Sequence, residues 1–383
     1  MNFKSAAFLT LLFIVAFSAR TQPYADKVFM NAKVFTSNDA QLFAEAVAIG
    51  WDSIMYVGDD NGVAAFIGPN TVVNDAGGKV ILPGFHDVHM HPLEAGSPVG
   101  AGCILDENET DPEVLGDEIW FCNPPTNPNG WITAWGHSIY TLLDATRPPK
   151  EILDDIYPFT PVIVMEVTSH SMWVNSEALF LAGIDEFTPD PVGGHIVKDP
   201  FTGEPNGILL DNAGDAVIEL ALAPSTAIDN ANYDGLVNYS LPLIAQNGIT
   251  SICEARTYWK RNYIEIWEDI KADGELTARV TLAPWAYPDD TDASLFPALQ
   301  SLFDAGDDML KIDQIKVYSD GITSNATAAL HDDYHDNLGW PFTKGLNYFS
   351  GDRLIDLVTT LELAGYDFHI HAIGDRGVTE AVN

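Results

Sequence analysis

The segment Pro83–Pro92, which reads Pro-Gly-Phe-His-Asp-Val-His-Met-His-Pro, carries the most informative pattern in this sequence of 383 residues. It overlaps the end of a strand-like apolar run, Val80–Phe85. Alternate side chains of a strand share a face, so we expect Asp87, His89 and His91 to point the same way. Two imidazoles on one face can share a metal ion, and a nearby carboxylate can orient them. Two unrelated loop histidines are the alternative at this point.

A second pair of histidines, His369 and His371, stands near the other end of the sequence, in Phe368–Asp375. Both alternate with apolar residues in a predicted strand, and two such pairs in one chain are hard to explain by packing alone. Neutral imidazole suits zinc, iron or nickel better than magnesium or calcium. We therefore expect a divalent metal cofactor, one or two ions, with zinc as the first choice and iron or nickel as alternatives.

Lys316 lies inside a third informative run, Ile315–Gly321 (Ile-Lys-Val-Tyr-Ser-Asp-Gly). Burial in such a run disfavours the ammonium and lowers the pKa of the amine. A neutral lysine can take up carbon dioxide as a carbamate, which is an anionic ligand able to bridge two metal ions. The alternative is an ordinary ion pair between Lys316 and a carboxylate such as Asp320.

The chain is strongly acidic, since 18 Lys and Arg stand against 55 Asp and Glu, for a net charge of −37. Phosphate recognition needs cationic side chains, so this balance excludes nucleic acid as a partner and disfavours an anionic membrane surface. Apolar residues make up 46% of the chain, which is enough for a large core and excludes wholesale disorder. The acidic residues are scattered along the chain, which indicates either adaptation to a salty medium or an ordinary acidic secreted protein.

Residues 1–21 have the pattern of a signal peptide, with Lys4 as its charged start, the apolar run Ala6–Phe17 and small residues after it. An uncleaved anchor is the alternative. We expect export to the periplasm or the medium, with no membrane association after cleavage. In an oxidising compartment Cys103 and Cys122 either form a disulfide or remain thiols.

The rest of the chain divides into two parts that differ in their sequence pattern. Residues 22–80 hold short β-type runs that predict a small antiparallel β unit, whereas strand-like and helical runs alternate after Val80 and predict an α/β fold with a parallel sheet. Residues 100–130 and 185–207 are expected to be long loops. The expected strands are Val80–Phe85, Pro161–Val167, Gly248–Cys253, Arg279–Leu282, Ile312–Tyr318 and Asp367–Ile373, and the expected helices are Lys150–Ile156, Asn232–Gln246, Tyr263–Ala272, Ala293–Asp304 and Asp352–Ala364.

Taken together, Pro83–His91, Lys316–Gly321 and His371–Asp375 resemble the signatures of the amidohydrolase superfamily, and in particular of its YtcJ-like (amidohydrolase 3) branch, which includes N-substituted formamide deformylases. The similarity runs from about residue 25 to the last residue. Further matching segments are Gly130–Ile132, Arg147–Pro149, His170–Ser176, Pro191–His195 and Gly203–Leu209.

The resemblance implies a (β/α)8 TIM-type barrel over residues 81–383, incomplete before its last strands, beside a small β-sandwich portion at residues 22–80. The site would lie at the carboxyl ends of the barrel strands. The metal ligands that it implies are His89, His91, His371 and a carboxylated Lys316; the catalytic residues are His170 and Asp320; and the supporting carboxylates are Asp87 and Asp375.

The resemblance also leaves gaps. A further metal-binding histidine and the aspartate that usually acts as general base are expected beyond Asn383, so the chain reads as a C-terminally truncated protein that by itself can lack activity. Thr168 and Ser169 replace the Asp-Gly that usually precedes the histidine matched by His170. His369 is not a usual family position and is expected to support the ligands or to lie in the core.

The resulting functional hypothesis is a metal-dependent hydrolase that cleaves a non-peptide C–N bond, in a small amide or formamide, by a metal-activated hydroxide. His170 would contact the substrate carbonyl. One alternative is a catalytically incomplete secreted protein that uses the same fold for ligand binding or regulation. Another is a metal-dependent esterase or lactonase. A homodimer is compatible with each of them.

Overall fold

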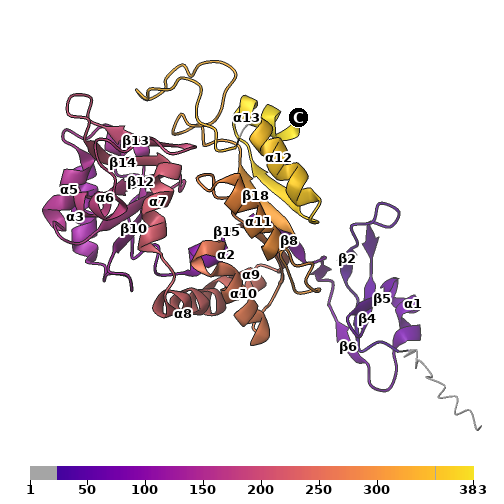
Figure 1. The fold of residues 1–383 in the computed structure, drawn as a ribbon. Helices are drawn as coiled ribbons and strands as arrows, with labels where there is room; N and C mark the ends of the chain where they lie inside the picture. The colour runs from indigo at the N-terminus through magenta and orange to yellow at the C-terminus, as the bar shows by residue number, and fades with distance from the viewer. Residues whose placement is uncertain (1–23, 350) are drawn as a thin grey trace, which may run out of the picture. The chain divides into compact units, whose positions relative to one another are not determined.

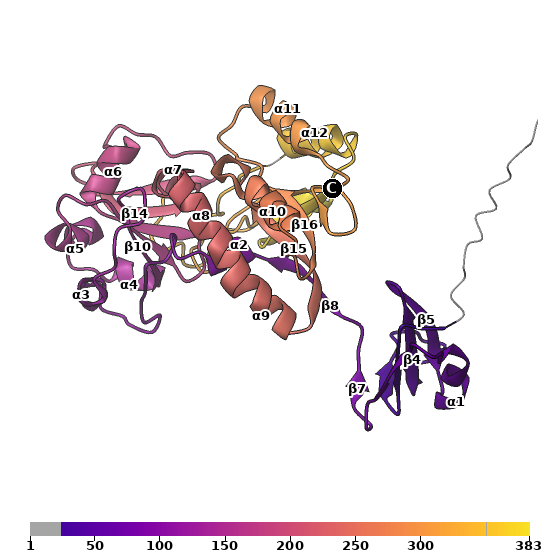
Figure 2. The ribbon, with the colours of Figure 1, turned by 90° about the horizontal axis from the view of Figure 1, so that it is seen from below.

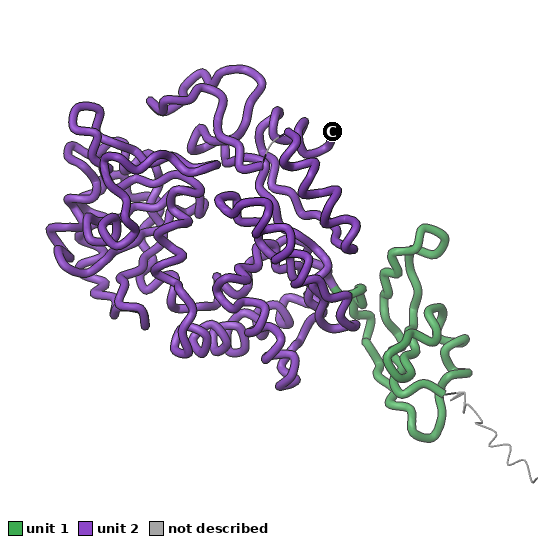
Figure 3. The backbone as a smooth tube through the Cα atoms, viewed as in Figure 1, with its two compact units in different colours: residues 1–84 green, residues 85–383 purple. Residues whose placement is uncertain are grey.

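The computed structural model describes residues 24–349 and 351–383, so the predicted signal peptide lies outside the described residues. The chain forms two compact units, residues 1–84 and 85–383 (Figure 3). In the described parts of the chain, every helix is too short or too polar to cross a membrane.

The first unit consists of two small sheets around two apolar clusters. In the larger sheet β1 pairs antiparallel with β4 but parallel with β6, and in the smaller one β2 pairs parallel with β7. The prediction of a purely antiparallel unit is therefore wrong: a short helical connection, α1 (Asp60–Val63) and η1 (Ala64–Phe66), separates β5 from β6, so β6 runs alongside β1. The larger sheet holds β5 (Ser53–Gly58), β4 (Ala46–Gly50), β1 (Lys27–Met30) and β6 (Val72–Asp75), and the smaller holds β3 (Phe43–Ala44), β2 (Lys33–Phe35) and β7 (Val80–Ile81).

The second unit contains parallel strands, and four of the predicted strands, Gly248–Cys253, Arg279–Leu282, Ile312–Tyr318 and Asp367–Ile373, correspond to β15, β16, β18 and β19. One sheet has the order β17-β16-β15-β8, and β18 pairs in parallel with β19. A single bridge between Trp285 and Lys316 joins the two groups. The strands are β8 (Phe85–Met90), β15 (Ile249–Thr257), β16 (Arg279–Pro284), β17 (Leu310–Lys311), β18 (Gln314–Tyr318) and β19 (Asp367–His371). The α/β class is confirmed.

The predicted strand Val80–Phe85 is wrong, because it is split between the two units. Residues 80–81 form β7 in the first unit, and β8 starts only at Phe85 in the second. Pro83 lacks the N–H that a continuous ladder would need. Asp87 and His89 lie on β8, as the alternation in the sequence predicts, whereas His91 is already the N-cap residue of the following helix, α2 (Pro92–Gly96).

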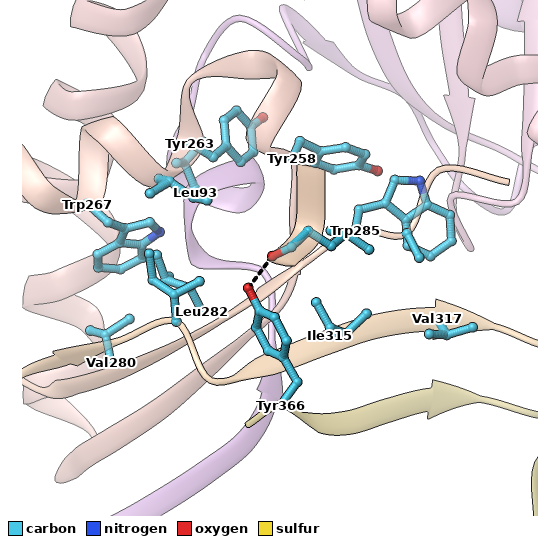
Figure 4. Packing of buried hydrophobic residues seen from close by; sticks show 14 of the residues in the cluster. Leu93, Tyr258, Tyr263, Trp267, Val280, Leu282, Trp285, Ile315, Val317 and Tyr366 are labelled. Carbon is cyan, nitrogen blue, oxygen red and sulfur yellow. Dashed lines mark hydrogen bonds between the residues drawn. The ribbon is translucent and has the colours of Figure 1, made fainter. Parts of the chain in front are cut away.

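The helices of this part cover the strands and close an apolar core that includes Trp267, Leu282 and Ile315 (Figure 4). The hydroxyl of Tyr366 enters this core and donates a hydrogen bond to the carbonyl of Leu299 at 2.7 Å. The helical elements are α8 (Thr226–Gly235), η2 (Leu236–Ser240), α9 (Leu241–Gln246), η3 (Trp259–Arg261), α10 (Tyr263–Ala272), α11 (Asp292–Leu302), α12 (Gly351–Glu362) and α13 (Asp375–Val382).

The part of the chain that follows β8 and precedes α8 forms a separate six-stranded mixed sheet, in the order β13-β14-β12-β11-β10-β9 (Figures 1 and 2). Its strands are β9 (Cys103–Ile104), β10 (Ile132–His137), β11 (Val162–Glu166), β12 (Ser171–Val174), β13 (Gly194–Lys198) and β14 (Pro205–Asp211). Helices α3 (Pro112–Cys122) and α5 (Pro149–Ile156) cover one face, and α6 (Ser176–Ala182) and α7 (Asn212–Ala221) cover the other; α4 (Ile139–Leu143) follows β10.

Two loop predictions are wrong in this region. Residues 100–130 contain β9 and α3, and residues 185–207 contain β13 and the start of β14. Glycine, proline and asparagine in these segments mark the turns between short elements, not long irregular loops. Cys103 and Cys122 form a disulfide that ties β9 to the end of α3, which decides between the two alternatives that the sequence left open.

Candidate metal centre

The side chains of β8 begin the candidate site. The backbone N–H of His89 donates to the Asp87 carboxylate at 3.0 Å, and the ring centroids of His89 and His91 lie 5.4 Å apart, nearly perpendicular. Asp87 is therefore held beside His89.

The two histidines of β19 meet different partners. In the parallel register Lys316 lies opposite His369 and Tyr318 opposite His371, so all four side chains share one face. Nε2 of His369 lies 3.0 Å from Nδ1 of His89, with the ring centroids 4.6 Å apart. His371 instead donates from Nε2 to the carbonyl of Gly321 at 3.0 Å and stacks on Tyr318. The geometry thus brings His369, rather than His371, to the histidines of β8.

Lys316 is buried among these rings, with a relative exposure of 1%, and its Nζ lies 5.3 Å from the centroid of the Tyr318 ring. Burial, and then the charge of Arg256, lowers the pKa of Lys316 to about 7. No ion pair of Lys316 is found among residues 24–349 and 351–383. A large share of the lysine is therefore the neutral amine near pH 7, which is the form that takes up carbon dioxide.

The imidazoles are also neutral near pH 7. Burial is the first cause in each case: it lowers the pKa of His91 to about 3 and those of His369 and His371 to about 4, and it lowers that of His89. The charge of Lys316 contributes to all four shifts. Because metal ions bind the neutral ring, these histidines do not need to lose a proton before they act as ligands.

Two glutamates that the sequence analysis did not single out lie beside His91. Nδ1 of His91 is buried and has no hydrogen-bond partner among the described residues; it lies 3.7 Å from Oε2 of Glu94 and 3.9 Å from Oε1 of Glu254. Burial raises the pKa of both carboxyls. Glu94 follows His91 by three residues, a spacing that could have been noticed, whereas Glu254 belongs to β15 and reaches His91 only through the fold.

His170 lies beside the side chains of β18 and β19. It is almost fully buried, its Nδ1 lies 2.6 Å from Oδ1 of Asp211, and its ring centroid is 5.2 Å from that of His371. The hydroxyl of Tyr348 donates to the same Asp211 oxygen at 3.1 Å. The sequence-predicted His170 therefore adjoins the histidines of β19, and Asp211 is a partner that the sequence analysis missed.

The carboxylates of Asp320 and Asp375 accept hydrogen bonds from backbone N–H groups. The carboxylate of Asp320 accepts hydrogen bonds from the N–H groups of Ala329, Ile373 and Gly374, at 2.7, 2.9 and 2.8 Å. Asp375 begins α13 and accepts from the N–H of His331 at 2.9 Å, and this bond lowers the pKa of Asp375. Asp320 thereby ties the end of β18 to the chain that follows β19.

The side chains gathered here are donors of the kind that a metal ion needs, although they do not yet surround a common point. In the described parts of the chain, no group of three or more His, Cys, Asp or Glu side chains is already arranged to hold a metal. The neutral rings of His89 and His369, the unpartnered Nδ1 of His91 and the buried amine of Lys316 nevertheless supply the nitrogen ligands that zinc, iron or nickel prefer. In its chemistry the set fits a divalent transition metal.

Comparison with known proteins shows the family to which the chain belongs. Residues 72–383 match the amidohydrolase family, and the chain belongs to that family, as the sequence predicts. The chain is 26% identical to LONG AFTER FAR-RED 3 of Arabidopsis thaliana, across 92% of this chain and 59% of the plant protein. It is 25% identical to the N-substituted formamide deformylase of Arthrobacter pascens, across 92% of this chain and 64% of that enzyme.

Solved structures agree on the fold. The chain superimposes on a metal-dependent hydrolase from Pyrococcus furiosus with a TM-score of 0.65 at 20% identity, covering 93% of this chain and 69% of the other. A metal-dependent hydrolase from Pyrococcus horikoshii gives 0.66 at 20% identity, covering 93% and 66%. The chain thus spans only about 59–69% of the length of these relatives and structures.

Proposed function

We propose that this chain carries the metal-binding part of a hydrolase that cleaves a non-peptide C–N bond in a small amide or formamide. The observation that carries the proposal is the meeting of His89 on β8 with His369 on β19, beside a buried Lys316 with a lowered pKa. Packing alone does not explain why neutral imidazoles and an unpaired amine gather on one face. Family membership and the deformylase of Arthrobacter pascens support the choice of a C–N bond.

In this proposal His89, His91 and His369 hold the metal, and Lys316 joins them as a carbamate. A bound divalent metal supplies Lewis-acid chemistry, because it polarises a carbonyl and lowers the pKa of water. His89 and His369, whose ring nitrogens lie 3.0 Å apart, would hold the ion from two different strands. Burial raises the pKa of Glu94 and of Glu254, and both carboxyl groups lie beside the buried Nδ1 of His91.

His170 would handle the substrate. Its Nδ1 is engaged by Asp211, so its Nε2 is the atom left to accept a hydrogen bond or a proton. The buried ring of Tyr318 stacks on His170, and the buried rings of Trp285 and Tyr348 pack against Tyr318, so they keep bulk water away from this side of the site. Asp320, which the resemblance makes catalytic, would act by holding the ends of β18 and β19.

The finer points of architecture belong to the same proposal. Strands β8, β15, β16, β18 and β19 would be five strands of a (β/α)8 barrel, with the first unit as part of a β-sandwich. Residues 1–21 would direct export, and the disulfide between Cys103 and Cys122 is compatible with an oxidising compartment. The acidic surface supports a small-molecule substrate over nucleic acid.

The test loads the protein with zinc, iron or nickel and assays N-substituted formamides and N-acyl amino acids against matched esters and lactones. We expect amide turnover that is lost on chelation and restored by metal. His89→Ala should abolish it, while His335→Ala, at an exposed histidine, should not. Turnover of esters alone would favour the esterase alternative, and metal binding without turnover would favour a ligand-binding protein.

A further inference from the structure

Asp211 occupies an unusual backbone position at the end of β14. Its φ of 50° and ψ of −127° are rare for a residue with a side chain. Such a conformation is strained for a residue with a Cβ and persists only where the surroundings impose it. The position is therefore held by specific contacts.

Those contacts join Asp211 to His170 twice. The backbone N–H of Asp211 donates to the carbonyl of His170 at 2.8 Å, in line with the antiparallel pairing of β12 and β14. The side chain then turns back, so that Oδ1 meets Nδ1 of His170 at 2.6 Å. The two residues form a closed pair in which neither side chain can rotate without losing a bond.

The carboxylate of Asp211 also meets residues that follow β18 in the chain. Its Oδ1 also accepts from the hydroxyl of Tyr348 at 3.1 Å, while its Oδ2 is buried with no hydrogen-bond partner among the described residues. A Cβ on Gly321 would come within 2.9 Å of that Oδ2. Gly321 is also the residue whose carbonyl accepts from His371. Asp211 thus lies between His170 and the strand end that fixes His371.

We propose that Asp211 is a positioning residue that fixes the tautomer of His170, so that Nδ1 carries the proton and Nε2 faces the substrate as an acceptor. A carboxylate beside one ring nitrogen selects the tautomer protonated at that nitrogen. The inference rests on the proposed function, because it assigns the free Nε2 to the substrate. The pairing itself can be measured without any substrate.

The experiment records long-range 1H–15N spectra of histidine-labelled protein at about pH 8.5, about two units above the ordinary histidine pKa, where an exposed imidazole is neutral. His170→Gln assigns the His170 signals by their loss. We expect the Nδ1-protonated tautomer in the unchanged protein, and loss of that preference in Asp211→Gly, which removes the acceptor oxygens. Glycine adopts positive φ without strain, so the fold should survive.

A second histidine–aspartate pair supplies the matched control. Nδ1 of His195 lies 2.7 Å from Oδ2 of Asp190, and the ring of His195 contacts those of Trp340 and Phe342. Asp190→Gly should change the spectrum of His195, leave that of His170 as it was and leave turnover unchanged. Asp211→Gly should lower kcat about a hundredfold or more with a smaller change in KM.

The outcomes are separable. An Nε2-protonated His170 in the unchanged protein, or an Nδ1-protonated His170 in Asp211→Gly, would overturn the inference whatever the activity. Unchanged kcat in Asp211→Gly, with the tautomer altered, would overturn the positioning role. If the unchanged protein hydrolyses no amide, the proposed function fails, and the spectra alone then decide whether Asp211 fixes the ring.

Discussion

Nε2 of His369 lies 3.0 Å from Nδ1 of His89, although 280 positions separate the two residues in the chain. One ring stands on β19 and the other on β8, which are not neighbours in the same sheet. The parallel register of β18 and β19 brings Lys316 to the same place. The fold therefore gathers three nitrogen donors from three strands, and the predictions below test what they hold.

Lys316→Ala should remove one equivalent of metal from the loaded protein, because the carbamate would be lost with the amine. Metal content is measured by mass spectrometry after gel filtration. Lys260→Ala is the control, since Lys260 is an exposed lysine paired with Asp290. Unchanged metal content in Lys316→Ala would rule out the bridging role.

His369→Ala and His371→Ala distinguish the two candidate ligands on β19. We expect His369→Ala to release its metal at a chelator concentration that leaves His371→Ala loaded, because only His369 contacts His89. Chelator titration followed by metal analysis measures the difference. The opposite order of release would restore His371 to the ligand set that the family resemblance implies.

Asp320→Asn should weaken the fold more than the chemistry. An amide presents an N–H group where Asp320 now accepts three backbone N–H bonds, and loss of one such bond to a buried charged group costs about 1–3 kcal/mol. Urea unfolding measures the free-energy difference, and kcat is measured at a temperature where both proteins are folded. A kcat reduced a hundredfold at unchanged stability would instead make Asp320 catalytic.

Stability should fall in acid partly through His137, which is fully buried against Trp173 and far from any exposed surface. Burial lowers its pKa from 6.5 to about 3, so between these values the unfolded chain binds a proton that the folded chain does not. Unfolding is thereby favoured as the pH falls from 6.5 towards 3, by about 2 kcal/mol at about pH 5 for a shift of this size.

The comparison of His137→Phe with the unchanged protein isolates that contribution. Urea unfolding at about pH 8 and about pH 5 should show a smaller loss of stability in the variant, because Phe does not titrate. His335→Phe, at an exposed position, should lose as much stability as the unchanged protein. Equal losses in all three proteins would show that His137 is not the source of the difference.

The local part of the site could be read from the sequence because it depends only on strand alternation. His89 and His91 are two residues apart, as are His369 and His371, and Lys316 sits in an apolar run that forms β18. The family resemblance, which family membership confirms, could supply roles for these positions but not their contacts. The choice between His369 and His371 depends on which ring points at β8, and no sequence pattern contains that information.

The partners from other elements could not be read in this way. Asp211 closes on His170 because β12 and β14 pair antiparallel, and Glu254 reaches His91 because β15 lies beside β8. The prediction of a strand at the apolar run Pro161–Val167 was likewise correct, but the run did not indicate to which sheet the strand belongs. A buried strand has the same composition in a parallel sheet as in the separate mixed sheet where β11 lies.

The most direct test of the central claim is an anomalous difference map from crystals of the zinc-loaded protein. The account predicts a peak about 2.0–2.1 Å from ring nitrogens of His89, His91 and His369, with density for a carbamate on Lys316. Zinc bound only at surface carboxylates, with the rings of His89 and His369 still in contact and Lys316 unmodified, would contradict it.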